Sequence, residues 1–347
     1  MTWLSQAVAD FGLDCKTKVA GPGDREDAIR APVEALIRSA GQHLNLRAVP
    51  YDEVRDMSRA VRTDHAVAVN GAITGYIDVK SPGLSLDPSR LTGLTRTRWE
   101  RQRDLPNVIH TNGTEWQLWR YRDHVAGPVH MTGGPLDRAG RSLVAPTEFE
   151  DLVTSFLRWR PAPITSVLTL VRAVAPLARL LRGEILDQLG VDRAQVAEGI
   201  ADQEQTFSAL ARDWRELFFP DVSDEVFAGG YAQAVTFALL VARGEKLELG
   251  DPLHELGARL GSADQSLMRG ALQLLTADVA VDFRVSLDLL VRVVGSVDWD
   301  RIKAGRRDLY LHMYEHFLDA YDPVLPRQCS SRDTPLEVVD HAVPEQG

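Results

Sequence analysis

Alternating apolar and polar residues predict a β-hairpin over residues 64–82, DHAVAVNGAITGYIDVKSP. Two runs rich in β-forming residues flank Asn70-Gly71, a dipeptide that strongly favours a hairpin turn. Because side chains two residues apart in a strand share a face, we expect Asp78 and Lys80 to project together. The pattern therefore places a carboxylate and an ammonium on one face of the second strand.

The register of this hairpin decides whether a second acid, Asp64, joins them. A two-residue turn would pair Val69 with Ala72 and leave Asp64 on the opposite face. A three-residue loop pairs Val69 with Ile73 instead, and in that register Asp64 lies directly opposite Asp78. This second register separates apolar from polar side chains cleanly, and a slip of one residue would reverse the faces. We therefore predict the bulged loop.

Two carboxylates and an ammonium on one sheet face suit phosphodiester hydrolysis. Asp64 and Asp78, with the carbonyl of Val79 and water, offer the hard oxygen ligands that Mg²⁺ prefers, and Mn²⁺ can substitute. The metal would lower the pKa of a bound water, while Lys80 would orient that water or a phosphoryl oxygen. The alternative is an edge hairpin with solvated charges, since an Asp-x-Lys triplet is common by chance.

A helix is predicted over residues 24–41, with Asp24 as its N-cap and Gly41 as its end. Apolar residues recur inside it at helical spacing. Pro32 falls within the same run, which predicts a kink or a restart at that point.

A second hairpin is predicted at Asn112-Gly113, and alternation in its second strand makes Trp116 a core residue. His110 precedes the turn and can approach the Asp78 strand, although an isolated histidine at a strand end is usually structural. Residues 127–142 are rich in Gly and Pro and are predicted to form a loop.

From residue 146 the apolar spacing becomes helical. Helices are predicted at 147–157, 168–189, 202–218, 224–242, 264–275 and 286–294. Pro176 should kink or divide the second of them. Apolar stripes at helical spacing are core more often than cofactor sites, so this region is predicted to be a connector or a docking surface without chemistry of its own.

Length and composition fit a two-domain globular protein. The chain has 347 residues, of which 44% are hydrophobic and 25% charged. We predict an α/β domain over 1–145, an all-α domain over 146–325 and a tail over 326–347. No apolar run approaches a membrane span, no signal peptide is apparent, and the two cysteines lack metal-ligand spacing, which favours a cytoplasmic protein without a membrane partner.

The net charge of −10 differs from the broad basic surface of a protein that grips DNA by itself. A local basic stretch runs from Arg90 to Arg103. If this segment is helical, Arg96, Arg98 and Arg101 can follow a phosphate backbone beside the hairpin; a solvated helix face is the equal alternative.

Asp64 followed by Asp78-x-Lys80 resembles the nuclease motif of the PD-(D/E)xK superfamily. Longer strings, at residues 31–37 (APVEALI), 75–83 (GYIDVKSPG) and 105–116 (LPNVIHTNGTEW), resemble the N-terminal nuclease region of fused restriction–methylation enzymes with an adenine N6-methyltransferase domain. The resemblance covers the first ~130 residues and the helical part loosely. It implies a mixed-sheet, restriction-endonuclease-like core and a helical connector.

The resemblance also assigns further residues. Glu34 stands where the family places an acidic helix residue that faces the site, and Glu53 is a lower-ranked rival. Two positions depart from the pattern. Thr63 replaces the usual proline before the first acid, and the glutamine expected after the D-x-K strand has no clear counterpart, although Arg98 or Gln102 stands near its place.

Residues 308–323 resemble the helix that leads into the methyltransferase domain of those enzymes. No glycine-rich strand–turn–helix for S-adenosylmethionine and no Asn-Pro-Pro-Tyr tetrad occurs in this sequence, so it does not encode the methyltransferase itself. We expect either a fragment of a fused enzyme or a nuclease subunit separated from its partners.

These patterns predict a Mg²⁺-dependent DNA endonuclease of a restriction–modification or phage-defence system. Asp64, Asp78, Lys80 and Glu34 are its candidate catalytic residues. The alternative is a catalytically dormant scaffolding or regulatory subunit whose helical domain docks a methyltransferase or another defence protein. Cutting both strands of DNA often requires two active sites, so a homodimer is one possible assembly. DNA binding without cleavage is a third reading.

Overall fold

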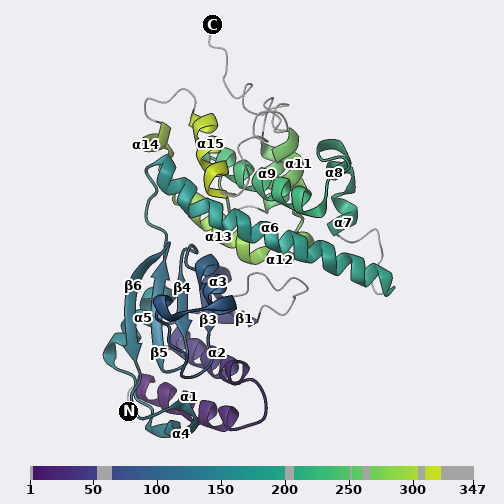
Figure 1. The fold of residues 1–347 in the computed structure, drawn as a ribbon. Coiled ribbons are helices and arrows are strands. Elements are labelled where there is room, and N and C mark those ends of the chain that lie inside the picture. The colour runs from purple at the N-terminus through teal and green to yellow at the C-terminus, as the bar shows by residue number, and fades with distance from the viewer. Residues whose placement is uncertain are drawn as a thin grey trace. The chain divides into compact units, whose positions relative to one another are not determined.

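The computed structural model describes residues 3–52, 65–199, 207–250, 252–260, 266–303 and 309–321. The chain divides into two compact units, Met1–Arg160 and Pro161–Gly347. The first contains a six-stranded sheet with helices, and the described part of the second is built from helices (Figure 1). This confirms the predicted class of an α/β core followed by a helical region. The boundary lies one helix later than residue 145.

The sheet has the strand order β1-β2-β3-β4-β5-β6. All neighbouring strands are antiparallel except β3 and β4, which run parallel. A parallel pair needs a crossover connection, and here it contains η1 (Pro88–Arg90) and α3 (Gly93–Gln102). The strands are β1 (Ala48–Asp52), β2 (His65–Val69), β3 (Ala72–Val79), β4 (Val108–Thr111), β5 (Glu115–Arg120) and β6 (Asp123–His130).

The turn between β2 and β3 is the two-residue form, so the predicted three-residue loop is wrong. Val69 pairs with Ala72, and both Asn70 (φ 53°) and Gly71 (φ 95°) have positive φ. Asn-Gly is well suited to this conformation, because glycine has no Cβ to clash and asparagine tolerates the left-handed region. At the turn itself, the conformational preference of Asn-Gly therefore decides the pairing, rather than the separation of apolar and polar side chains onto two faces.

A β-bulge further along restores the predicted register. Val67 pairs with Gly75 while Ala68 pairs with Ile73, which leaves Thr74 as the additional residue. Beyond the bulge His65 pairs with Ile77, as the three-residue loop would have arranged. The predicted pairing of Asp64 with Asp78 lies outside the described residues.

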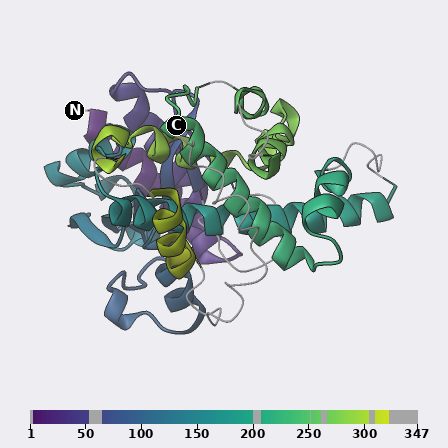
Figure 2. The ribbon, with the colours of Figure 1, turned by 90° about the horizontal axis from the view of Figure 1, so that it is seen from above.

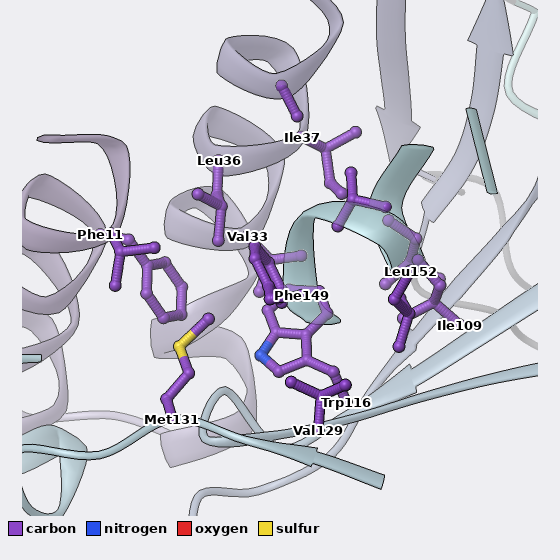
Figure 3. Close-up of a cluster of buried hydrophobic side chains, with 14 of the residues drawn as sticks. Phe11, Val33, Leu36, Ile37, Ile109, Trp116, Val129, Met131, Phe149 and Leu152 are labelled. Atoms are coloured by element: carbon purple, nitrogen blue, oxygen red, sulfur yellow. The ribbon is translucent and has the colours of Figure 1, made fainter. Parts of the chain in front are cut away.

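The core of the α/β unit lies on one face of the sheet (Figure 3). Helices α1 (Trp3–Val19), α2 (Arg25–His43) and α5 (Thr147–Leu157) pack there. Trp116 from β5 is fully buried, with ring centroids 5.1 Å from Phe149 and 6.3 Å from Phe11. This confirms Trp116 as a core residue. Because α5 contributes Phe149 and Phe156 to the same core, it belongs to the α/β unit.

Helix α2 matches the predicted first helix in position, although α1 precedes it. The carboxylate of Asp24 accepts a hydrogen bond from the Glu26 amide and so caps α2 as predicted. Pro32 does not divide the helix. Its ring is buried in the core, and this packing retains the helix despite the lost backbone hydrogen bond.

The predicted loop at 127–142 is only partly a loop. Strand β6 continues through Gly127 and Pro128 to His130, and short α4 (Leu136–Ala139) and η2 (Gly140–Ser142) follow. Proline cannot donate to a sheet ladder, but β6 is the edge strand, where one side needs no donor. The proline therefore did not exclude a strand here.

The helical unit is arranged around two long helices, α6 (Val167–Ala197) and α9 (Asp224–Gly244), which pack against each other (Figures 1 and 2). Pro176 does not divide α6, because the residues around it are buried against neighbouring helices. The other helices are α7 (Phe207–Leu210), α8 (Arg212–Phe218), α10 (Leu253–Arg259), α11 (Ser266–Gln273), α12 (Ala277–Asp282), α13 (Arg284–Gly295), α14 (Trp299–Lys303) and α15 (Leu309–Tyr321).

Helix α9 is long and apolar enough to cross a membrane by length and composition, so the prediction that no apolar run approaches a membrane span is wrong for this segment. In the structure 78% of that apolar stretch is buried. A core helix of a soluble unit passes the same test, so the packing of α9 against its neighbours accounts for its composition.

Candidate functional site

The carboxyl end of β3 places Asp78 on the sheet face opposite the main core. Its neighbours Ile77 and Val79 are fully buried in that core, so strand alternation turns Asp78 the other way. Asp78 pairs in register with His110 on parallel β4. The Nδ1 atom of His110 lies 2.9 Å from Oδ2 of Asp78.

Two further side chains reach the other oxygen of Asp78. Lys80 Nζ donates to Oδ1 at 2.7 Å, and Gln102 Nε2 donates to the same atom at 3.2 Å. All four side chains are buried, with Asp78 at 1% and Lys80 at 3% exposed. Buried charges are stable only when paired and hydrogen-bonded, and this cluster meets that condition. Asp78 and Lys80 are therefore brought together as predicted.

The cluster keeps Asp78 ionised. Burial by itself raises the pKa of Asp78, but the hydrogen bond from His110 and the charge of Lys80 outweigh it, so the pKa lies below its usual value. An ionised carboxylate only accepts hydrogen bonds, so His110 must donate from Nδ1. The Nε2 atom of His110 is buried and has no hydrogen-bond partner among the described residues.

Helix α3 covers this face of the sheet. Gln102 is its last residue, and Trp99 packs edge-to-face on Trp119 of β5 with ring centroids 5.8 Å apart. The guanidinium of Arg103 lies 5.0 Å from the Trp99 ring. The sequence left Arg98 and Gln102 as alternatives near the expected glutamine, and the structure shows Gln102 bonded to Asp78, while the side chain of Arg98 lies outside the described residues.

Glu34 lies on α2, and the structure pairs it with other groups. Its carboxylate lies 3.5 Å from Nδ1 of buried His65 and 2.8 Å from Arg38. His65 is directly opposite Ile77, so its side chain lies on the face opposite Asp78. A catalytic role for Glu34 stays a prediction. Asp64, Glu53 and Thr63 lie outside the described residues.

The predicted DNA-contacting arginines lie on or beside α3. Arg96 is partly used within the unit: it pairs with Glu100, donates to the Pro88 carbonyl at 2.7 Å and lies 5.4 Å from the Trp99 ring. The backbones of Arg98 and Arg101 belong to α3, but their side chains are outside what the structure describes.

The donor set fits a divalent metal in part. The carboxylate of Asp78 and the carbonyl of Val79 are oxygen donors at one strand end, whereas Nε2 of His110 points away from Asp78 because Nδ1 faces it. Among the described residues, however, no group of three or more His, Cys, Asp or Glu side chains converges for a metal ion. Mg²⁺ is usually held by one or two carboxylates together with water and phosphate oxygens, and Asp64, the candidate for a second carboxylate, lies outside that part of the chain.

Comparisons with known proteins assign no family. No family model matches the sequence, and no curated protein matches it. Among solved structures, a cryo-electron microscopy structure of a DrdV–DNA complex matches with a TM-score of 0.32 and 18% sequence identity. The match covers 92% of this chain and 29% of the DrdV chain. The chain thus spans under a third of its neighbour's length, and likeness at this level establishes no shared function.

Proposed function

We propose that the α/β unit is a Mg²⁺-dependent DNA endonuclease domain of a restriction–modification or phage-defence system. The supporting observation is the buried cluster of Asp78, Lys80, Gln102 and His110 at the end of β3. A buried cluster of charged and polar side chains costs desolvation energy and adds little to stability, so function is the simplest reason to retain it. The resemblance of the Asp78-x-Lys80 hairpin to PD-(D/E)xK nucleases supplies the reaction class.

Each residue has a defined role in this proposal. Asp78 and Asp64, with the carbonyl of Val79, would hold Mg²⁺ or Mn²⁺, which supplies a bound water of lowered pKa and stabilises phosphate charge. Lys80 orients the nucleophilic water or a phosphoryl oxygen. Glu34 would have to leave its partners His65 and Arg38 to assist as a further acid.

Gln102 and His110 hold the carboxylate of Asp78 in one orientation. Gln102 contributes a neutral donor and His110 contributes its Nδ1 proton, so both fix the oxygens without removing the negative charge. They are positioning residues in this account.

DNA contact is proposed through Arg96, Arg98 and Arg101 of α3. The net charge of −10 makes a strong unassisted grip on DNA unfavourable. We therefore propose that affinity comes from a second copy of the chain or from a partner such as a methyltransferase docked on the helical unit. Such a system operates in the cytoplasm, where the DNA is.

A second candidate is a dormant subunit that docks a defence partner. One observation favours it: both oxygens of Asp78 are already engaged, and all four cluster side chains are at most 3% exposed. A site this closed must rearrange before it can admit a phosphate.

Plasmid cleavage with Mg²⁺, Mn²⁺ or EDTA tests the proposal. Wild type should cut with either metal and not in EDTA, and Lys80→Ala should not cut. Lys303→Ala, which removes a partly buried lysine of the helical unit bonded to the Gly244 carbonyl, is the matched control and should cut like wild type. Cleavage that survives Lys80→Ala refutes the assigned site, and no cleavage with any metal supports the dormant subunit.

A further inference from the structure

Two histidines lie one turn apart on the outer face of α15. His312 and His316 are separated by four residues, and their Nε2 atoms are 3.2 Å apart. Their ring centroids are 4.3 Å apart. Both rings therefore turn the same nitrogen toward one point beside the helix. The nuclease proposal makes no use of this pair.

The opposite face of α15 fixes the helix in the helical unit. Leu309, Met313, Phe317 and Tyr321 are buried along it. The Phe317 ring packs edge-to-face on Phe237 of α9 at 5.1 Å, and α15 also packs along α6. A helix held along one side presents its outer side chains at fixed spacing. The histidine pair is thus preorganised by the core beneath it.

We propose that His312 and His316 form a binding site for a divalent transition metal such as Zn²⁺. Two histidines four residues apart on a helix can bind one metal ion through one face. With Zn–N bonds of about 2.0–2.1 Å in a tetrahedron, two ligand nitrogens lie about 3.4 Å apart. The observed Nε2 separation is close to this value without any movement of the helix.

Water would fill the remaining ligand positions. Glu315 and Asp319 follow at the spacing that places them on the same side of the helix, and both are exposed. No third His, Cys, Asp or Glu converges with the pair in the described part of the chain. The site is therefore a two-histidine chelate with open positions.

This site differs in chemistry from the proposed nuclease centre. Imidazole nitrogen suits Zn²⁺, Ni²⁺ and Cu²⁺, whereas Mg²⁺ prefers carboxylate, carbonyl and water oxygens. Without metal, one ring must donate its Nε2 proton to the lone pair of the other. Metal binding takes both lone pairs instead, with each proton carried on Nδ1.

Isothermal titration of ZnCl₂ into the tag-free, chelator-treated full chain tests the site. Wild type should bind one equivalent more tightly than His312→Ala or His316→Ala, by at least about 10-fold for the loss of a ligand. The double variant should bind no more weakly than either single variant, since one histidine alone no longer chelates. His254→Ala, which removes a histidine of α10, is the control and should bind like wild type.

Two results would overturn the site: unchanged Zn²⁺ affinity in both single variants, or losses that add independently in the double variant. Either would leave the pair as a hydrogen-bonded imidazole contact only. Circular dichroism confirms that the variants fold, and excess MgCl₂ should not displace the Zn²⁺. Asp78→Asn should keep the Zn²⁺ site, so failure of the nuclease proposal and failure of this one are distinguishable.

Discussion

Among the described residues, ten buried polar or charged side chains accompany the apolar core of the α/β unit, whereas three are buried in the helical unit. Four of the ten, Asp78, Lys80, Gln102 and His110, make up one cluster at the end of β3 and β4. The helical unit instead buries rings such as Trp214, Phe227 and Tyr231 against each other. Both units fold around a core, and within the described part of the chain it is the α/β unit that gathers several ionisable groups into one buried cluster.

This difference between the two units matters because apolar burial stabilises a fold, whereas buried charged groups add little to its stability. Apolar burial stabilises either unit at roughly 25 cal/mol per Å². A buried ion pair gives little net stability, because desolvation offsets the attraction between the charges. The proposed function therefore rests on the cluster around Asp78, and we expect any chemistry of the helical unit at its surface, where His312 and His316 lie.

The largest expected effect is that of Asp78→Ala on stability. This change leaves the buried ammonium of Lys80 without its carboxylate and should lower the free energy of unfolding by about 3–5 kcal/mol. Asp192→Ala is the matched change in the helical unit, since buried Asp192 accepts from the Ser208 amide and hydroxyl. It should cost about 1–3 kcal/mol. Urea unfolding followed by circular dichroism measures both, and a larger loss for Asp192→Ala would contradict the comparison.

Acid should remove the ionic part of the Asp78 contribution. Because the pKa of Asp78 is lower in the folded state than its usual value, its contribution is complete above about pH 4, the unfolded pKa. It is lost as the pH falls through the lower, folded pKa. The difference in the free energy of unfolding between wild type and Asp78→Asn should be constant from neutral pH down to about pH 4 and should shrink below that pH. A difference that stays constant or grows as the pH falls below about 4 would show that the pKa of Asp78 is not lowered.

Gly75→Ala should destabilise the α/β unit by a smaller amount. A Cβ at Gly75 would lie 2.3 Å from the Asn107 carbonyl oxygen and 2.8 Å from the Phe156 ring. Forcing that atom into the contact between β3, β4 and α5 should cost about 1–3 kcal/mol. Thermal unfolding should show a lower Tm.

Gly183→Ala is the control in the helical unit. It lies inside α6, with no atom within 4 Å of the added Cβ, so alanine should stabilise the helix by about 0.5–1 kcal/mol. The same substitution thus has opposite signs in the two units, and a shared sign would refute this account of Gly75.

The smallest expected effect is on the chemical reactivity of Cys15, a thiol in the apolar core on one side of the sheet. Cys15 of α1 is fully buried, and burial raises the pKa of its thiol to about 12. At pH 8 almost no thiolate forms, so iodoacetamide should leave Cys15 unmodified in the folded protein and modify it in urea. Mass spectrometry of the peptide that contains Cys15 measures this, and rapid labelling of the folded protein would show an open core.

Much of the site-bearing strand was predictable from local pattern. Strand alternation paired Asp78 with Lys80, and Asn70-Gly71 marked the turn. The bulge at Thr74 was not predictable, because no residue type signals an extra residue in the middle of a strand. Strand β6 was missed because its proline suggests a loop unless the strand is known to lie at an edge.

The rest of the cluster depended on tertiary structure. Gln102 and His110 lie 24 and 32 residues from Asp78, and the parallel pairing of β3 with β4 brings them to it. The sequence offered Gln102 only beside Arg98 for the glutamine position, and it offered His110 as a histidine that is usually structural. Only the crossover through α3 settles which side chains meet the carboxylate.

The most direct test of the central claim is cleavage of supercoiled plasmid in Mg²⁺ by Asp78→Asn beside Asp192→Asn. The two variants remove the charge of a buried carboxylate from the α/β unit and from the helical unit, and circular dichroism confirms that both fold. The account predicts that Asp78→Asn does not cut and that Asp192→Asn cuts like wild type. Cleavage by folded Asp78→Asn at the wild-type rate would contradict it.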